Sequence, residues 1–184
     1  GFRVTTGTED KLFNQYYVVE YRTYKGYDQG LKVGPYYFGY ANNPLLVDYV
    51  DHFPYQDGML INYWDTSQAD NNTGLHPGYG LLLPVDAHYQ TLLRTPTSRW
   101  RNRIQTYDST FTLSPTDWFT VHNSSVPYTI PSLPAVKTFD DRILHYDPTN
   151  PLGSVIHPNT GTQIRILSIG AQDSFMQVEF RPAK

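Results

Sequence analysis

Short runs of alternating hydrophobic and polar residues dominate this chain. Residues 14–22 (NQYYVVEYR) are strand-like, and the period of two of a β-strand divides their side chains between two faces. One predicted face carries Tyr17, Val19 and Tyr21, and the other carries Tyr16, Val18, Glu20 and Arg22. We expect Glu20 to pair with Arg22 or another arginine, across the sheet or in the interior, rather than to act in catalysis.

Three further segments predict strands. Residues 59–64 (MLINYW) and 80–85 (GLLLPV) are apolar enough for a buried sheet, and residues 117–122 (DWFTVH) form a shorter strand. Pro84 has no N–H for a sheet hydrogen bond, so it marks an edge, a bulge or the end of its strand. Residues 99–113 also alternate and supply further apolar contacts.

The end of the chain predicts a β-hairpin. Residues 163–169 (QIRILSI) and 175–180 (FMQVEF) both alternate, and the intervening residues 170–174 form a connection of hairpin length. Two proline-interrupted segments, 124–134 and 148–158, read instead as linkers between strands.

The remaining segments predict long loops rather than helices. Residues 25–35 carry glycines at three positions and indicate a turn-rich loop, and residues 35–55 indicate an irregular flap rich in aromatics and prolines. No long amphipathic helix is evident. The sequence therefore predicts an all-β fold, a β-sandwich with long irregular loops and a C-terminal hairpin, although the pattern leaves a barrel open.

Composition supports this fold class. Aspartate outnumbers glutamate by 14 to 3, and there are 16 tyrosines. Aspartate and asparagine suit turns and tyrosine suits half-buried strands, whereas straight-chain helix formers are scarce. We expect residues 1–184 to form a single β-rich domain, because a chain of this length buries roughly 70% of its unfolded surface without needing disulfides.

Charge and cysteine content exclude several classes of function. The formal net charge is −3 and only 17% of residues are charged, which argues against general nucleic-acid binding despite a basic cluster at Arg94, Arg99, Arg101 and Arg103. The chain has no cysteine, which excludes a disulfide scaffold and cysteine-ligated zinc. No apolar run approaches a membrane span, and residues 1–10 lack signal-peptide architecture, so we expect a fragment of a longer protein.

The familiar catalytic motifs are missing from the sequence. A zinc peptidase needs two histidines one helical turn apart with a glutamate that activates water, the H-E-x-x-H pattern, and no histidine here precedes a glutamate. The six histidines are never closer than 12 residues in sequence, so we expect isolated surface or hydrogen-bonding side chains. The serine-hydrolase elbow, the phosphate loop and the dinucleotide fingerprint are also absent. Asp140 and Asp141 could in principle serve a glycosidase, but adjacent strand residues point to opposite faces, which favours a solvated turn.

One loop is dense in hard oxygen ligands. Asp65, Asp70, Asn71 and Asn72 lie within residues 65–74 (DTSQADNNTG), and such groups can coordinate calcium. The spacing does not match an EF-hand loop. The alternative is that these side chains bond to nearby main-chain N–H groups in Asx turns, without a metal.

Aromatic side chains offer a second kind of site. Trp64, Trp100 and Trp118 could form a platform for sugar rings or peptide, although aromatic cores of β-sandwiches give the same pattern. Residues 36–40 (YYFGY) and 52–55 (HFPY) could dock on a neighbouring domain, since burying a few such rings contributes several kcal/mol before ordering costs.

Several unusual segments recur in an order that resembles a known family. They are the strand ending VVEYR, then GYDQGL at 26–31, then GMLINYWD at 58–65, then HPGYGLLLPVD at 76–86. This series resembles the region downstream of the zinc site in secreted M6 metallopeptidases of the immune inhibitor A type. The resemblance covers residues 14–113, and residues 114–184 are expected to complete the same domain. It implies a β-rich domain packed beside a catalytic domain, and it places no catalytic residue on this chain.

We therefore predict a non-catalytic accessory domain of a secreted zinc metallopeptidase, supporting or docking on the catalytic domain. By this resemblance any zinc belongs to an upstream catalytic domain, and the partner is that domain of the same protein. The main alternative is a carbohydrate- or cell-wall-binding module that uses exposed aromatics. A third interpretation is an independent hydrolase with a convergent site. Under the accessory-domain interpretation, we assign no catalytic or cofactor-binding residue to this chain. Asp65, Asp70 and Asn72 are the candidate calcium ligands.

Overall fold

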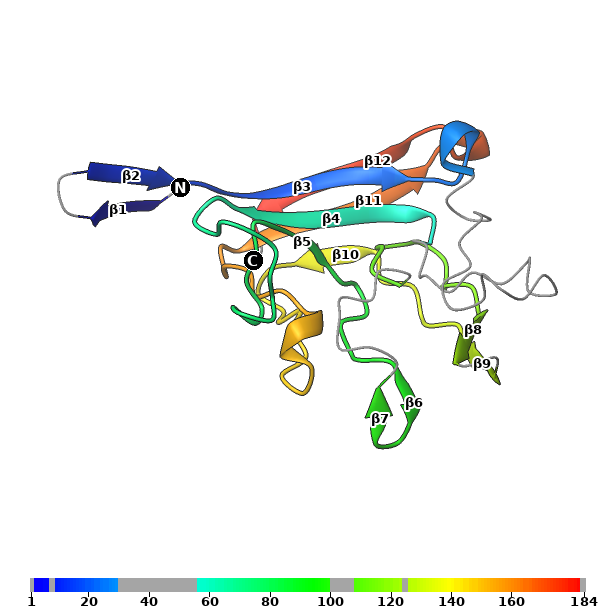
Figure 1. Cartoon of the computed structure of the whole chain (residues 1–184). Coiled ribbons are helices and arrows are strands. Elements are labelled where there is room, and N and C mark those ends of the chain that lie inside the picture. Colours follow the sequence, from blue (N-terminus) through cyan, green and yellow to red (C-terminus); the bar gives the residue numbers. More distant parts are fainter. Residues whose placement is uncertain (1, 7–8, 30–55, 100–107, 124–125, 183–184) are drawn as a thin grey trace.

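A computed structural model of the chain consists almost entirely of β-strands and loops (Figure 1). The structure describes residues 2–6, 9–29, 56–99, 108–123 and 126–182. The helical elements in these ranges are short 3-10 turns, η1 (Gly26–Asp28), η3 (Pro151–Gly153) and η4 (Ala171–Asp173). None of the described helices is long and apolar enough to cross a membrane.

The first sheet contains β3 (Gln15–Arg22), β4 (Gly58–Asp65) and β5 (Leu82–Val85), in that order and all antiparallel. β3 and β4 pair over their whole length without a register shift. β5 pairs with the other side of β4 and contains Pro84, so the prediction that this proline marks a sheet edge is confirmed.

The second sheet contains β10 (Thr138–Asp140), β11 (Thr162–Ile169) and β12 (Met176–Pro182). β11 and β12 form the predicted C-terminal hairpin, with a bulge between Ile166 and Ser168 and with η4 in the connection. The hairpin and the first sheet lie one behind the other in Figure 1.

The inner faces of the two sheets share one hydrophobic core. Alternate residues of β4 and β5 point inward to meet alternate residues of β10 and β11. The ring centroids of Tyr17 on β3 and Phe139 on β10 are 4.9 Å apart, which ties the two sheets together directly. The largest fully buried side chains of this core are those of Phe111, Phe139, Met59, Ile61, Ile164, Ile166, Val85 and Val155. The predicted all-β sandwich is confirmed.

Three two-stranded hairpins accompany the sheets: β1 (Phe2–Thr6) with β2 (Glu9–Phe13), β6 (Leu93–Thr95) with β7 (Ser98–Arg99), and β8 (Phe119–Asn123) with β9 (Val126–Ile130). β1 and β2 project away from the body of the molecule (Figure 1). The interpretation of residues 124–134 as a linker is wrong for β9. Its Pro127 is tolerated because a two-stranded ladder leaves one side of each strand unpaired.

Several predicted features fall where the structure gives no description. The proposed docking segments 36–40 and 52–55 and the side chain of Trp100 lie outside the described residues. Arg101 and Arg103 of the basic cluster also lie outside them. The site is therefore built from the two sheets and the loops that join them.

Candidate functional site

The outer face of the first sheet carries an exposed apolar row. Tyr16 pairs with Trp64 across β3 and β4, and Trp64 pairs with Leu82 across β4 and β5, so the three side chains lie side by side on one face. They are 49%, 42% and 41% exposed, and Val18 beside them is 40% exposed. We call Tyr16, Val18, Trp64 and Leu82 the outer-face patch.

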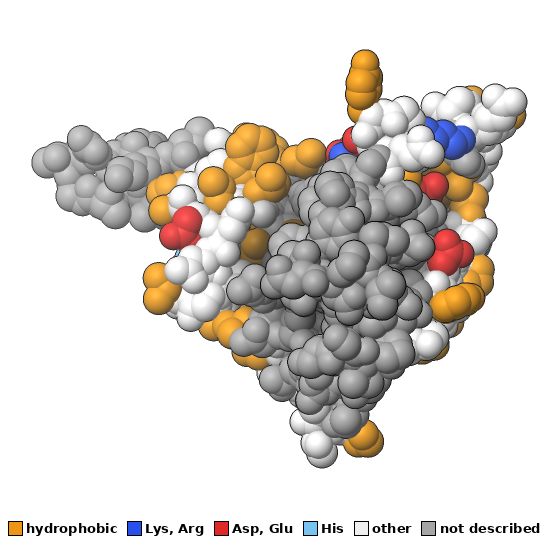
Figure 2. Space-filling model, turned by 45° about the vertical axis from the view of Figure 1, so that its right-hand side comes forward, with side chains coloured by type: hydrophobic (Ala, Val, Ile, Leu, Met, Phe, Trp, Pro, Cys, Tyr) orange, Lys and Arg blue, Asp and Glu red, His pale blue; other side chains and the backbone are white. Residues whose placement is uncertain are grey.

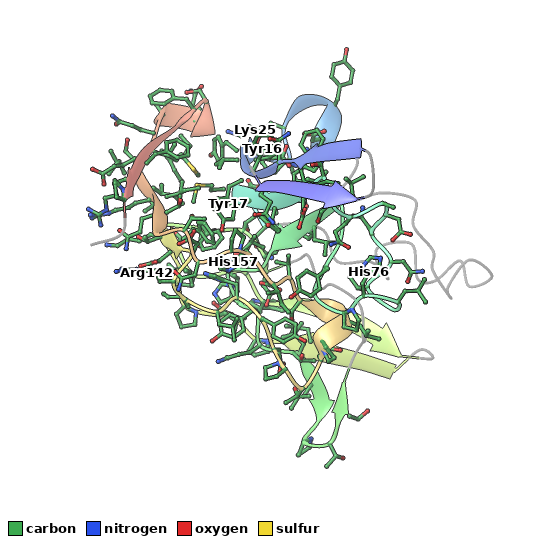
Figure 3. All side chains as sticks on the ribbon, turned by 90° about the vertical axis from the view of Figure 1, so that its left-hand side faces the viewer. Tyr16, Tyr17, Lys25, His76, Arg142 and His157 are labelled. Carbon is green, nitrogen blue, oxygen red and sulfur yellow. The ribbon has the colours of Figure 1, made fainter. Side chains whose placement is uncertain are left out.

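The geometry of the patch favours contact with a protein surface. The ring centroids of Tyr16 and Trp64 are 6.0 Å apart with 60° between the ring planes, an edge-to-face pair. Figure 2 shows hydrophobic side chains at the surface near the end of the molecule from which β1 and β2 project. In Figure 3, Tyr17 lies on the side of His157, while Tyr16 lies away from it, as alternation along β3 requires. Contiguous exposed apolar side chains of this kind mark interaction sites.

The opposite face of β3 leads to two buried histidines. Tyr17 donates its hydroxyl hydrogen toward Asp141 and the carbonyl of Pro158, and its ring lies against His157. The ring centroids of His157 and His145 are 5.6 Å apart. The prediction of isolated histidines is wrong here, because the fold brings together side chains 12 residues apart in sequence.

Burial keeps these two histidines neutral. It lowers the pKa of His145 to about 4, although the bond from Nδ1 to the Asp86 carbonyl, 3.0 Å long, acts in the opposite direction. Burial likewise lowers the pKa of His157. Both rings pack among aromatic side chains of the core, so they act as polar core residues.

A second polar cluster combines Asp86, His88 and Asp108. Their ligand atoms lie within 4.8 Å of one another, which makes this trio the one metal-capable group of three or more such side chains found in the described ranges. Asp86 and Asp108 are buried, and burial raises the pKa of Asp86 to about 7 against the lowering effect of the His88 N–H and charge.

The ring of His88 does not face a metal in this arrangement. Its Nδ1 lies 2.7 Å from the carbonyl oxygen of Asp108, and its Nε2 lies 2.8 Å from that of Pro134. Carbonyl oxygens can only accept, so the ring nitrogen donates in each such bond and its lone pair is not directed at a metal. A metal would have to displace both bonds. The trio is better explained as a histidine that joins two loops beside buried carboxylates.

An apolar cavity opens beside His88. Its volume is about 450 Å³, and the lining comes from residues 87–93 and from 129–131, 133 and 134. The volume would admit a small ligand. Because the nitrogens of His88 are already bonded to carbonyl oxygens, this side chain offers such a ligand no ring hydrogen without breaking a bond.

The calcium candidates form a loop held by its own hydrogen bonds. Asp65 accepts from the main-chain N–H and the hydroxyl of Ser67, and Asp70 accepts from the N–H of Asn72 and lies 2.8 Å from Nε2 of His76. The side-chain oxygen of Asn72 accepts from the N–H of Gly74. Asn71 reaches the N–H of Leu82 and so ties the loop to β5. These are the Asx contacts of the metal-free alternative, and calcium binding by Asp65, Asp70 and Asn72 stays a prediction.

Asp140 and Asp141 differ from the predicted solvated turn. Both are buried, and the prediction is wrong because each has its own set of donors. Arg142 forks onto Asp140 and holds the pKa of that carboxyl far below its usual value. Asp141 accepts from Thr160, Gly161, Thr162 and the hydroxyl of Tyr17. Burial alone would raise the pKa of Asp141, but these bonds lower it. The two carboxylates are structural.

Glu20 has the partner that its position on β3 predicts. Its carboxylate lies 3.7 Å from the guanidinium of Arg22, two residues along the same face, and both side chains are partly exposed. The pair is therefore neither cross-strand nor buried. The exposed pair contributes little to stability.

The comparisons with known proteins decide the family. A family model described as the VEG domain of immune inhibitor A-like metallopeptidases matches residues 10–178. The chain belongs to this family. The match extends well beyond residues 14–113, on which the resemblance rested.

Two relatives place this VEG domain within larger proteins. Immune inhibitor A of Bacillus thuringiensis subsp. alesti is 33% identical over 172 residues, which is 91% of this chain and 22% of the relative. The pre-pro-metalloprotease PrtV of Vibrio cholerae is 36% identical over 101 residues, which is 54% of this chain and 10% of that relative. The chain thus spans about a fifth or less of the relatives it matches.

Sequence reasoning recovered only part of the outer-face patch. It singled out Trp64 and placed Tyr16 and Val18 on a common strand face, but it did not show which face is exposed. Leu82 went unnoticed within an apolar run that reads as buried. The pairing of Tyr16, Trp64 and Leu82 across three strands is set by the register, which the sequence does not state.

Proposed function

We propose that this VEG domain is a non-catalytic accessory domain of a secreted zinc metallopeptidase and that its outer-face patch docks on the peptidase unit of the same protein. The observation that carries the proposal is the row of Tyr16, Trp64 and Leu82 exposed across three strands. The family supports the link to a peptidase, and the absence of an H-E-x-x-H motif from the sequence supports a non-catalytic role.

The size of the patch favours docking within one polypeptide. The four side chains of the patch together expose on the order of 300 Å² of surface to water, given the total areas of such side chains. Covering this area contributes about 7 kcal/mol before costs. Association of separate molecules costs roughly 4–15 kcal/mol, which offsets most of that gain, whereas a covalent tether supplies an effective concentration of about millimolar. The patch suits a partner that is already attached.

The test uses the longer protein that contains both units. Trp64→Ala and Leu82→Ala together should lower the melting midpoint of the peptidase unit while the VEG domain keeps its own transition. Trp118→Ala is the matched control, since Trp118 is 66% exposed and belongs to none of the three strands of the first sheet. Equal midpoints for the double variant and the control would overturn the docking proposal.

The carbohydrate-binding alternative predicts a different result. The edge-to-face geometry of Tyr16 and Trp64 presents no flat pair of rings, which disfavours a sugar platform on this face. A glycan pull-down with the isolated chain tests this alternative. Saturable binding that is lost in Trp64→Ala would favour a binding module over an accessory domain.

A further inference from the structure

The edges of the two sheets differ in how they are protected against pairing. β5 carries Pro84, and β10 has only three residues. β12 carries Glu179 and Arg181, ends in Pro182 and pairs through a bulge. Residues 15–19 of β3 contain no charge, proline or bulge, and within the part of the chain that the structure describes no strand pairs with their far side.

The register shows which main-chain groups face that edge. The N–H of Thr66 donates to the carbonyl of Asn14, so Asn14 and every second residue after it bond toward β4. The main chain of Met59, which lies opposite Tyr21, bonds to Phe111 on the other side of β4 and not to β3. This agrees with the same alternation along β3. The N–H and C=O groups of Gln15, Tyr17 and Val19 therefore point away from the sheet.

The side chains along this edge are self-complementary. In an antiparallel pair of two β3 strands centred on Tyr17, Gln15 of one copy lies opposite Val19 of the other. On the outer face Tyr16 of one copy then lies opposite Val18 of the other, and Glu20 lies opposite Asn14. An aromatic side chain therefore packs against a β-branched one, and no two like charges face each other. This register makes about six main-chain hydrogen bonds.

We propose that β3 is an interface for a second copy of this chain, which adds its own β3 antiparallel with Tyr17 at the two-fold axis. The two three-stranded sheets then form one continuous sheet. The inner faces remain as they are, because Tyr17 and Val19 keep their positions in the core. This interface uses the main-chain edge of the sheet, whereas the proposed docking uses its outer face; Tyr16 and Val18 contribute side chains to both.

Sedimentation velocity over a range of concentrations tests the proposal on the 184-residue chain. The wild type should pass from monomer to dimer as concentration rises. Val18→Lys, which places a charge opposite Tyr16 of the other copy, should weaken dimerisation about tenfold or more. Leu82→Lys is the control, since Leu82 is equally exposed on the same face but lies on the far edge, and it should dimerise like the wild type.

A second variant keeps the test decisive if Val18→Lys does not fold. Gln15→Pro removes an outward N–H and leaves the main-chain bonds to β4 in place, although the side-chain bond from Gln15 to Asp65 is lost. It should also reduce dimerisation. In a sample that mixes labelled and unlabelled chains, intermolecular contacts should join the Tyr16 ring to the Val18 methyl groups. A wild type that stays monomeric at all concentrations would overturn the proposal. So would a dimer that survives both edge variants, or one that Leu82→Lys disrupts equally.

Discussion

Replacing His145 by glutamine should remove a large part of the acid sensitivity of this domain. The imidazole is buried between Phe139, Phe111 and His157, and its Nδ1 bonds to the Asp86 carbonyl. A glutamine amide can still donate to that carbonyl but cannot take up a proton. The variant therefore separates the titration of His145 from its hydrogen bond.

The magnitude follows from the lowered pKa of His145. The folded state takes up a proton near pH 4, whereas the unfolded state does so near 6.5. Between these values the unfolded state binds more protons, so the free energy of unfolding falls as the pH is lowered through this window. From pH 8 to pH 5 the loss due to His145 is about 2 kcal/mol.

Denaturant unfolding of wild type and His145→Gln at pH values from 8 to 5 measures this loss. Asp86 has a raised pKa and so contributes a slope of opposite sign, but it is present in both proteins and cancels in the difference. The unfolding free energy of the wild type minus that of His145→Gln should fall by about 2 kcal/mol between pH 8 and pH 5. His76→Gln is the control: bonding to Tyr79 and Asp70 raises the pKa of His76, so its slope has the opposite sign. Parallel curves for wild type and His145→Gln would refute the reasoning.

Three further outcomes are expected. Asp141→Ala should destabilise the domain by about 3 kcal/mol in denaturant unfolding, because it strands the N–H donors of the loop at residues 160–162; a change below 1 kcal/mol would contradict that role. Gly58→Ala should cost about 1–3 kcal/mol, since a Cβ there would lie 2.7 Å from the carbonyl oxygen of Phe111; an unchanged midpoint would show that the two segments can move apart. The calcium prediction for Asp65, Asp70 and Asn72 requires the melting midpoint to fall in EDTA, and an unchanged midpoint would end it.

Strand patterns and turn residues along the chain predicted the sandwich, although they left a barrel open. The C-terminal hairpin shows a period of two, and β3 and β4 are recognisable from aromatic and apolar runs; the inner residues of these strands form the core. The hairpin of β1 and β2 was missed because each strand has only five residues, too few for a clear alternating pattern. β9 was missed because prolines were taken to exclude pairing, whereas an isolated two-stranded ladder tolerates one.

The site was harder to predict than the fold because it depends on contacts distant in sequence. Asp141 looks like a turn residue next to Asp140, and only the approach of the loop at residues 160–162 gives it donors. His145 and His157 read as unrelated histidines until β10 and the loops after it bring their rings together. The outer-face patch depends on the register between three strands, which local patterns do not fix.

Oxidative footprinting of Trp64 tests the central claim most directly. The isolated chain and a longer protein that joins it to the proposed peptidase unit are exposed to hydroxyl radicals, and the modification of each tryptophan is compared. If the outer face docks on the peptidase unit, Trp64 and Tyr16 should be protected several-fold in the longer protein, while Trp118 reacts equally in both. Equal modification of Trp64 in the two proteins would contradict the account.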